Sequence, residues 1–74
     1  MQSNLRPLPD EMPIGERIVT VLLIRGNEVM QAKTKGEKRE IAALAQDTDL
    51  LLCVWTGKWS SDSFFLPIDR LRSV

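Results

Sequence analysis

Two stretches of the chain are rich in β-branched and apolar residues, and they predict the main strands. Residues 17–25 read Arg-Ile-Val-Thr-Val-Leu-Leu-Ile-Arg. A return strand over residues 28–33 follows Gly26-Asn27, a pair typical of a two-residue hairpin turn. Residues 50–56 form a second strong strand pattern, and residues 64–66 anchor a fourth strand. The pattern therefore predicts two hairpins.

The predicted register of the first hairpin divides its side chains between two faces. A tight turn places Arg25 opposite Glu28 and Val21 opposite Ala32, and opposite residues share a face. One face suits a core and carries Val19, Val21, Leu23, Met30 and Ala32. The other carries Ile18, Leu22, Ile24 and Val29 beside Gln31, Lys33 and Lys35. This second face is more apolar than a solvated sheet face needs to be.

The second hairpin leaves two registers open. A tight turn at Gly57-Lys58 pairs Leu51 with Phe64. The loop-like residues 60–63, Ser-Ser-Asp-Ser, favour a longer or bulged connection instead.

Between the hairpins, Thr34 and Glu37 have the spacing of a capping box and predict a helix that runs to about Gln46. Its buried stripe is expected to consist of Ile41, Leu44 and Ala45. Acidic residues at 47 and 49 mark the exit from the helix and are assigned to capping and turns. After Pro67 ends the last strand, Asp69 is expected to cap one short helical turn.

These elements predict a small α+β domain over residues 17–74, ordered β-β-α-β-β, with one main helix and a short C-terminal helical turn. Residues 1–16 are expected to form a flexible arm, because Pro7, Pro9 and Pro13 forbid a regular helix or a central strand. Leu5, Leu8, Met12 and Ile14 could staple this arm onto the domain. No targeting segment is expected, and the longest apolar runs are too short to cross a bilayer.

Composition removes several classes of function. The 74 residues include no His and a single Cys, so Ser–His and Cys–His nucleophilic pairs are excluded and a zinc site nearly so. The glycines form no phosphate-cradling pattern, and the aspartates match no metal loop. We therefore expect no metal, no cofactor and no enzymatic activity. Cys53 lies in an apolar run and is expected to be a buried, reduced thiol in a cytosolic protein.

Charge is balanced overall but uneven along the chain. Ten basic and ten acidic residues give zero net charge, whereas residues 17–39 hold six basic and two acidic residues. This segment is either a solvated strand edge and helix start or a patch that attracts phosphates or an acidic protein. A nucleic-acid-binding alternative would use Arg17, Lys33, Lys35, Lys38 and Arg39, with Trp59 available for stacking.

Trp59, beyond the second turn, either folds back over the sheet or stands exposed as an interface anchor. Together with the apolar face of the first hairpin, it supports a protein-binding role. The candidate partner-binding residues are Leu5, Leu8, Ile14, Ile18, Leu22, Ile24, Val29, Arg25, Lys33 and Trp59.

In length, neutral charge and small sheet-plus-helix pattern, the chain resembles small bacteriophage proteins that bind host RNA polymerase. The features that carry the resemblance are residues 1–7 (Met-Gln-Ser-Asn-Leu-Arg-Pro), the strand at 17–25 and the hairpin residues 54–59 (Val-Trp-Thr-Gly-Lys-Trp). The resemblance implies a regulator in the cytoplasm of a bacterial host. Such a protein docks on a large polymerase subunit, inhibits initiation and promotes antitermination, and we expect a monomer or weak homodimer that does not enter membranes.

Overall fold

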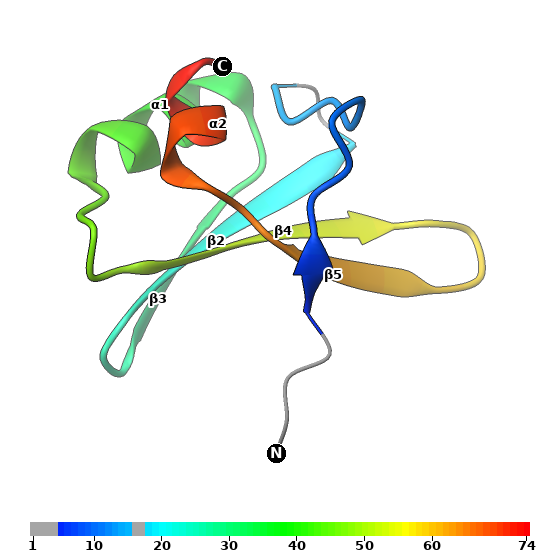
Figure 1. The fold of residues 1–74 in the computed structure, drawn as a ribbon, viewed down its shortest axis with the longest axis horizontal. Coiled ribbons are helices and arrows are strands. Elements are labelled where there is room, and N and C mark those ends of the chain that lie inside the picture. Colours follow the sequence, from blue (N-terminus) through cyan, green and yellow to red (C-terminus); the bar gives the residue numbers. More distant parts are fainter. Residues whose placement is uncertain (1–4, 16–17) are drawn as a thin grey trace.

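The computed structural model describes residues 5–15 and 18–74 and confirms the α+β class (Figure 1). The elements are β1 (Arg6–Pro7), β2 (Val19–Arg25), β3 (Glu28–Ala32), α1 (Lys35–Leu44), β4 (Leu50–Thr56), β5 (Ser61–Phe65) and α2 (Ile68–Arg72). The strands form one sheet in the order β1-β5-β4-β2-β3. All neighbours are antiparallel except β1, which runs parallel to β5.

The first hairpin has the predicted register, with Arg25 opposite Glu28 and Val21 opposite Ala32. Its turn needs a positive φ at Gly26, which has a φ of 60°, and at no other described residue. A positive φ at the first central residue only is typical of a type II′ turn, whose twist matches that of the flanking strands. The two turn residues, Gly26 and Asn27, therefore account for this register.

The second hairpin has the longer connection of the two that the sequence allowed. Residues 57–60 form the loop, and Leu52 pairs with Phe65 while Cys53 pairs with Phe64. The pairing of Leu51 with Phe64 is therefore wrong. The Gly57 N–H donates to the Ser60 carbonyl at 2.7 Å, so the loop closes on its own backbone after Thr56.

Helix α1 begins at the predicted capping box. The Glu37 N–H donates to Thr34 Oγ1 at 3.1 Å, and the Thr34 N–H donates to Glu37 Oε1 at 3.1 Å. The buried face of the helix consists of Lys38 and Ile41, followed by Ala45 at the C-cap. Leu44 was expected on this face but is 52% exposed. The buried positions 38, 41 and 45 are spaced by three and four residues, and Leu44 lies about 100° around the helix from Ala45, off this stripe.

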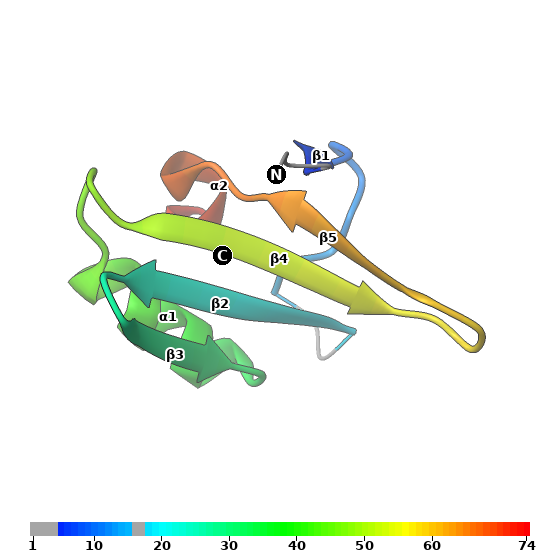
Figure 2. The same cartoon turned by 90° about the horizontal axis from the view of Figure 1, so that it is seen from below.

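The helices and residues 8–15 lie on one face of the sheet, and the core sits between these layers (Figure 1). The buried side of the sheet is the predicted one. It contributes Val19, Val21, Leu23, Ala32, Leu51, Cys53 and Phe64. Neither α1 nor α2, the two helices of the described residues, covers the opposite face, as the view from below shows (Figure 2).

The segment expected to be an arm packs against this core where the structure describes it. Leu8 and Ile14 are 9% and 4% exposed. Arg70, from α2, donates to the carbonyls of Pro9 at 3.4 Å and Met12 at 3.1 Å. Backbone groups of the segment are thus held by a side chain from the far end of the chain.

Strand β1 was missed by the sequence analysis. Arg6 lies opposite Phe64 and Pro7 opposite Phe65, at the edge of the sheet where a proline is tolerated. The Arg6 guanidinium lies 5.3 Å from the Phe64 ring centroid and 3.2 Å from Asp62 Oδ1. These contacts hold a very short strand in place.

Helix α2 confirms the predicted C-terminal helical turn but not its cap. Pro67 occupies the N-cap position, and no side chain caps the helix. Asp69 lies within the first turn instead, because the helix begins at Ile68. Leu71, 1% exposed, anchors α2 in the core. Among the described residues, no helix has the length and apolar character to cross a membrane.

Candidate protein-binding surface

The uncovered face of the sheet is an apolar surface that four strands build together. Pairing places Ile24 beside both Val29 and Leu50, and it places Leu22 beside Leu52, which in turn pairs with Phe65. Because paired residues share a face, these side chains form adjacent rows. We define the open face as Leu22, Ile24, Val29, Leu50, Leu52, Val54 and Phe65.

Exposure confirms that the part of the chain described by the structure leaves this face uncovered. Val29 is 61%, Phe65 48% and Leu50 36% exposed. Leu22 and Ile24, in the middle of the sheet, are half-buried by their strand neighbours. Ile18, just before β2, is also exposed. The expected apolar face of the first hairpin therefore exists, and a further hairpin extends it.

Four members of the open face escaped the sequence analysis: Leu50, Leu52, Val54 and Phe65. Leu50, Leu52 and Val54 are spaced by two, which places these three on one face of β4 and is a usable signal. The sequence did not show that β2 and β4 are neighbours in the sheet, because this pairing joins residues far apart in the chain.

A shallow groove of about 470 Å³ continues the open face past β5. Leu5, Pro7, Phe65 and Pro67 line it together with Arg6 and Leu8. Leu5, one of the candidate partner-binding residues, is 38% exposed here. Leu8 contributes to this groove with only 9% of its surface exposed, and Ile14 is 4% exposed. Because the monomer buries both side chains, we remove them from the residues expected to contact a partner.

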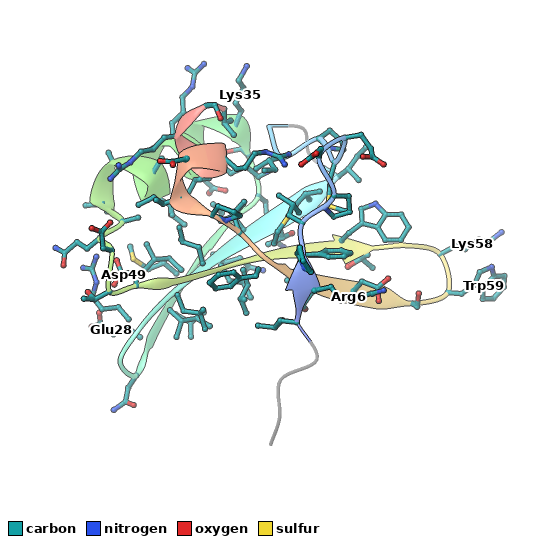
Figure 3. The ribbon with its side chains drawn as sticks, viewed as in Figure 1. Arg6, Glu28, Lys35, Asp49, Lys58 and Trp59 are labelled. Carbon is teal, nitrogen blue, oxygen red and sulfur yellow. The ribbon has the colours of Figure 1, made fainter. Side chains whose placement is uncertain are left out.

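Arg25 was assigned to partner binding, but the structure gives it an internal partner. Its Nε and Nη2 atoms donate to the Asp49 carboxylate at 2.8 and 2.7 Å, and Nη2 also donates to the Leu44 carbonyl at 3.0 Å. This bidentate pair ties the end of β2 to the turn between α1 and β4. Asp49 lies at that turn in Figure 3. The Gln46 N–H donates to Asp49 Oδ2 at 2.8 Å, which confirms the predicted turn role of Asp49.

The hydrogen bonds from Arg25 and from the Gln46 N–H lower the pKa of Asp49 from 3.8 to about 2. A carboxyl group with a lowered pKa stabilises the fold fully above its unfolded pKa, and this contribution disappears as the pH falls towards the folded value. We expect Asp49→Asn to reduce stability at neutral pH and to flatten the acid-unfolding curve between about pH 4 and pH 2. Circular dichroism across this range measures the effect. Asp47→Asn, at an exposed position two residues earlier, is the control, and an equal flattening there would contradict the assignment.

The predicted basic patch is smaller than the sequence suggested. Lys38 is 0% exposed, and its Nζ donates to the Ile14 carbonyl at 2.7 Å, so it cannot contact a nucleic acid. Arg25 is engaged by Asp49, and Arg17 lies outside the described residues. Lys33, Lys35 and Arg39 remain exposed, at the start of α1 (Lys35 is labelled in Figure 3). A set of this size gives little of the phosphate neutralisation on which nucleic-acid affinity depends.

Of the two alternatives for Trp59, the structure shows the exposed one. It lies at the tip of the β4–β5 hairpin and is 88% exposed, pointing away from the sheet (Figure 3). The Lys58 Nζ atom lies 5.4 Å from its ring centroid. Trp55 behaves differently, because its ring packs back against Gly57 and the core. Trp59 is therefore a second exposed apolar group, at the tip of the hairpin whose strands carry part of the open face.

The remaining candidate for chemistry, Cys53, is a structural residue. Burial raises the pKa of the Cys53 thiol to about 11, so it stays protonated at neutral pH. Its Sγ atom lies 4.0 Å from the sulfur of Met12. Among the described residues, no three acidic or cysteine side chains cluster in a way that could hold a metal ion.

Comparison with known proteins gives no relative from which a function could be carried over: no protein family, curated protein or solved structure matches the chain.

Proposed function

We propose that the protein is a non-enzymatic protein-binding regulator whose partner covers the open face. The observation that carries the proposal is the continuous apolar surface on four strands, with Val29, Leu50 and Phe65 all exposed. Burying one such side chain completely gains about 1.5–3 kcal/mol. A chain of this size keeps these groups in water at a cost, which a partner would relieve.

The partner we propose is a large subunit of bacterial RNA polymerase, in the cytoplasm of a bacterial host. The support is the resemblance in length, neutral charge and small sheet-plus-helix pattern to phage regulators that inhibit initiation and promote antitermination. Trp59 at the hairpin tip adds an aromatic anchor of the kind that dominates protein interfaces. The exposed lysines at the start of α1 would steer an acidic partner surface. The nucleic-acid alternative loses Lys38, which is buried, and is not proposed.

A binding measurement with purified bacterial core RNA polymerase tests this function. The double variant Val29→Glu/Phe65→Glu places two carboxylates on the open face, and we expect the Kd to rise at least about 100-fold, because two apolar contacts of roughly 1.5 kcal/mol each are lost. The matched control is Ala43→Glu/Leu44→Glu, which adds the same charges at exposed apolar positions of α1. We expect the control to bind like the unmodified protein. Absence of binding by the unmodified protein, or equal loss in both variants, would contradict the proposal.

A further inference from the structure

The two edges of the sheet are protected very differently. On one side, β5 is covered by β1, and Pro7 there has no N–H to offer to a further strand. On the other side, β2 is the only strand that pairs with β3 among the described residues 5–15 and 18–74. Residues 28–32 read Glu-Val-Met-Gln-Ala and contain neither the proline nor the lysine with which edge strands are commonly blunted. The β3 edge is therefore open.

Hydrogen-bond alternation shows which β3 groups face outward. The Leu66 N–H donates to the Leu51 carbonyl at 3.0 Å, so the odd-numbered residues of β4 bond to the β5 side. The even-numbered residues of β4 then bond to β2, and by the same alternation the odd-numbered residues of β2 bond to β3. This leaves the N–H and C=O groups of Val29 and Gln31 directed away from β2.

The turn of the first hairpin gives the same assignment of outward-facing groups in β3. A two-residue hairpin turn joins Arg25 and Glu28 by hydrogen bonds, and the next pair along the ladder, Ile24 and Val29, is not hydrogen-bonded. At the far end, the outward N–H of Lys33 already donates to Glu37 Oε1 at 2.9 Å. The capping box therefore closes the edge at Lys33. Val29 and Gln31 remain available to another strand.

We propose that the partner binds as an extended segment that adds a strand to the β3 edge. Such strand addition draws its affinity from main-chain hydrogen bonds and its specificity from alternate side chains. The proposal rests on the proposed protein-binding role and specifies how the partner is recognised. The added strand would lengthen the open face by one row, next to the exposed Val29.

The side chains along this edge define the chemistry of the segment. Val29, Gln31 and Lys33 point to the open face, since they alternate with the core-facing Met30 and Ala32. A matching segment has an apolar residue opposite Val29 and an acidic residue opposite Lys33, four positions apart. Lys35, at the first position of α1, adds positive charge at the same end.

The test uses the whole protein and a phage-displayed library of random peptides of about twelve residues as the probe. We expect the selected peptides to share the apolar and acidic spacing given above. Gln31→Pro removes one outward N–H while leaving the β2 pairing intact, and it should weaken peptide binding about tenfold or more. The matched control, Gln31→Thr, keeps the N–H and should change the affinity by less than about twofold.

Amide hydrogen exchange on the unmodified protein provides a second readout that does not depend on the folding of the proline variant. Peptide binding should slow the exchange of the Val29 and Gln31 amides, and Met30, already bonded to β2, should change little. Failure to select peptides, equal affinity of the proline and threonine variants, or unprotected amides would overturn strand addition.

These outcomes separate the two proposals. Polymerase binding that survives Gln31→Pro would leave the proposed function standing without strand addition. Selected peptides that protect the β3 amides, without polymerase binding, would sustain strand addition and reject the named partner. A dimer of the free protein in sedimentation that Gln31→Pro abolishes would make a second copy the occupant of the edge and overturn the proposal of a partner segment.

Discussion

Lys38→Ala is expected to destabilise the fold by about 2–5 kcal/mol, because it removes a fully buried stem and leaves the Ile14 carbonyl without this donor. The whole stability of a domain of this length is roughly 4–11 kcal/mol. The variant should therefore lose a substantial share of its stability and unfold at a clearly lower urea concentration. Urea denaturation followed by circular dichroism measures the change.

Two further variants separate the effect of burial from that of the hydrogen bond. Lys35→Ala removes the same side chain three residues earlier in α1, where it is exposed, and should change stability by less than about 0.5 kcal/mol. Lys38→Met keeps most of the apolar stem and loses the ammonium group, so it should fall between the two. If Lys38→Ala were no more destabilising than Lys35→Ala, the buried hydrogen bond would not hold residues 8–15 in place.

Gly57→Ala is expected to cost about 1–3 kcal/mol, because overpacking against a rigid ring strains the structure. A Cβ atom at this position would lie 2.6 Å from Trp55 Cη2 and 2.7 Å from Cζ3. The ring would have to move, and the loop at 57–60 would shift with it. In a domain of this size, each kcal/mol lowers the Tm by roughly 4–8 °C. Thermal denaturation measures the loss of stability. Near-ultraviolet circular dichroism, to which the packed Trp55 ring contributes, reports the movement of the ring.

Gly36 provides the matched control for this variant. A Cβ atom there meets nothing within 4 Å, and position 36 lies in the first turn of α1. Gly36→Ala should be neutral or stabilising by up to about 1 kcal/mol, since alanine has the higher helix propensity. Equal destabilisation by both variants would mean that contact with Trp55 is not the reason for glycine at position 57.

The candidate surface was only partly predictable. Leu22, Ile24 and Val29 followed from the alternation within one hairpin, because residues on one face of a strand are spaced by two. Leu50 and Phe65 belong to the same surface only because β4 lies between β2 and β5. The predicted basic patch was wrong at Lys38 for a related reason. A lysine at position 38 reads as a solvated residue, and only the packing of residues 8–15 over α1 makes it a buried donor.

Signals that act over a few residues were sufficient for the sequence to determine the α+β class, the register of the first hairpin and the start of α1. A hairpin turn and a capping box are each complete within about four residues, so their geometry is encoded where it is used. The tertiary structure alone decided the strand order, the pairing of β1, the Arg25–Asp49 ion pair and the burial of Lys38. Both side-chain contacts join residues separated by 24 positions. Nothing in the local pattern specifies a partner so distant, because such contacts form only when the whole chain is packed.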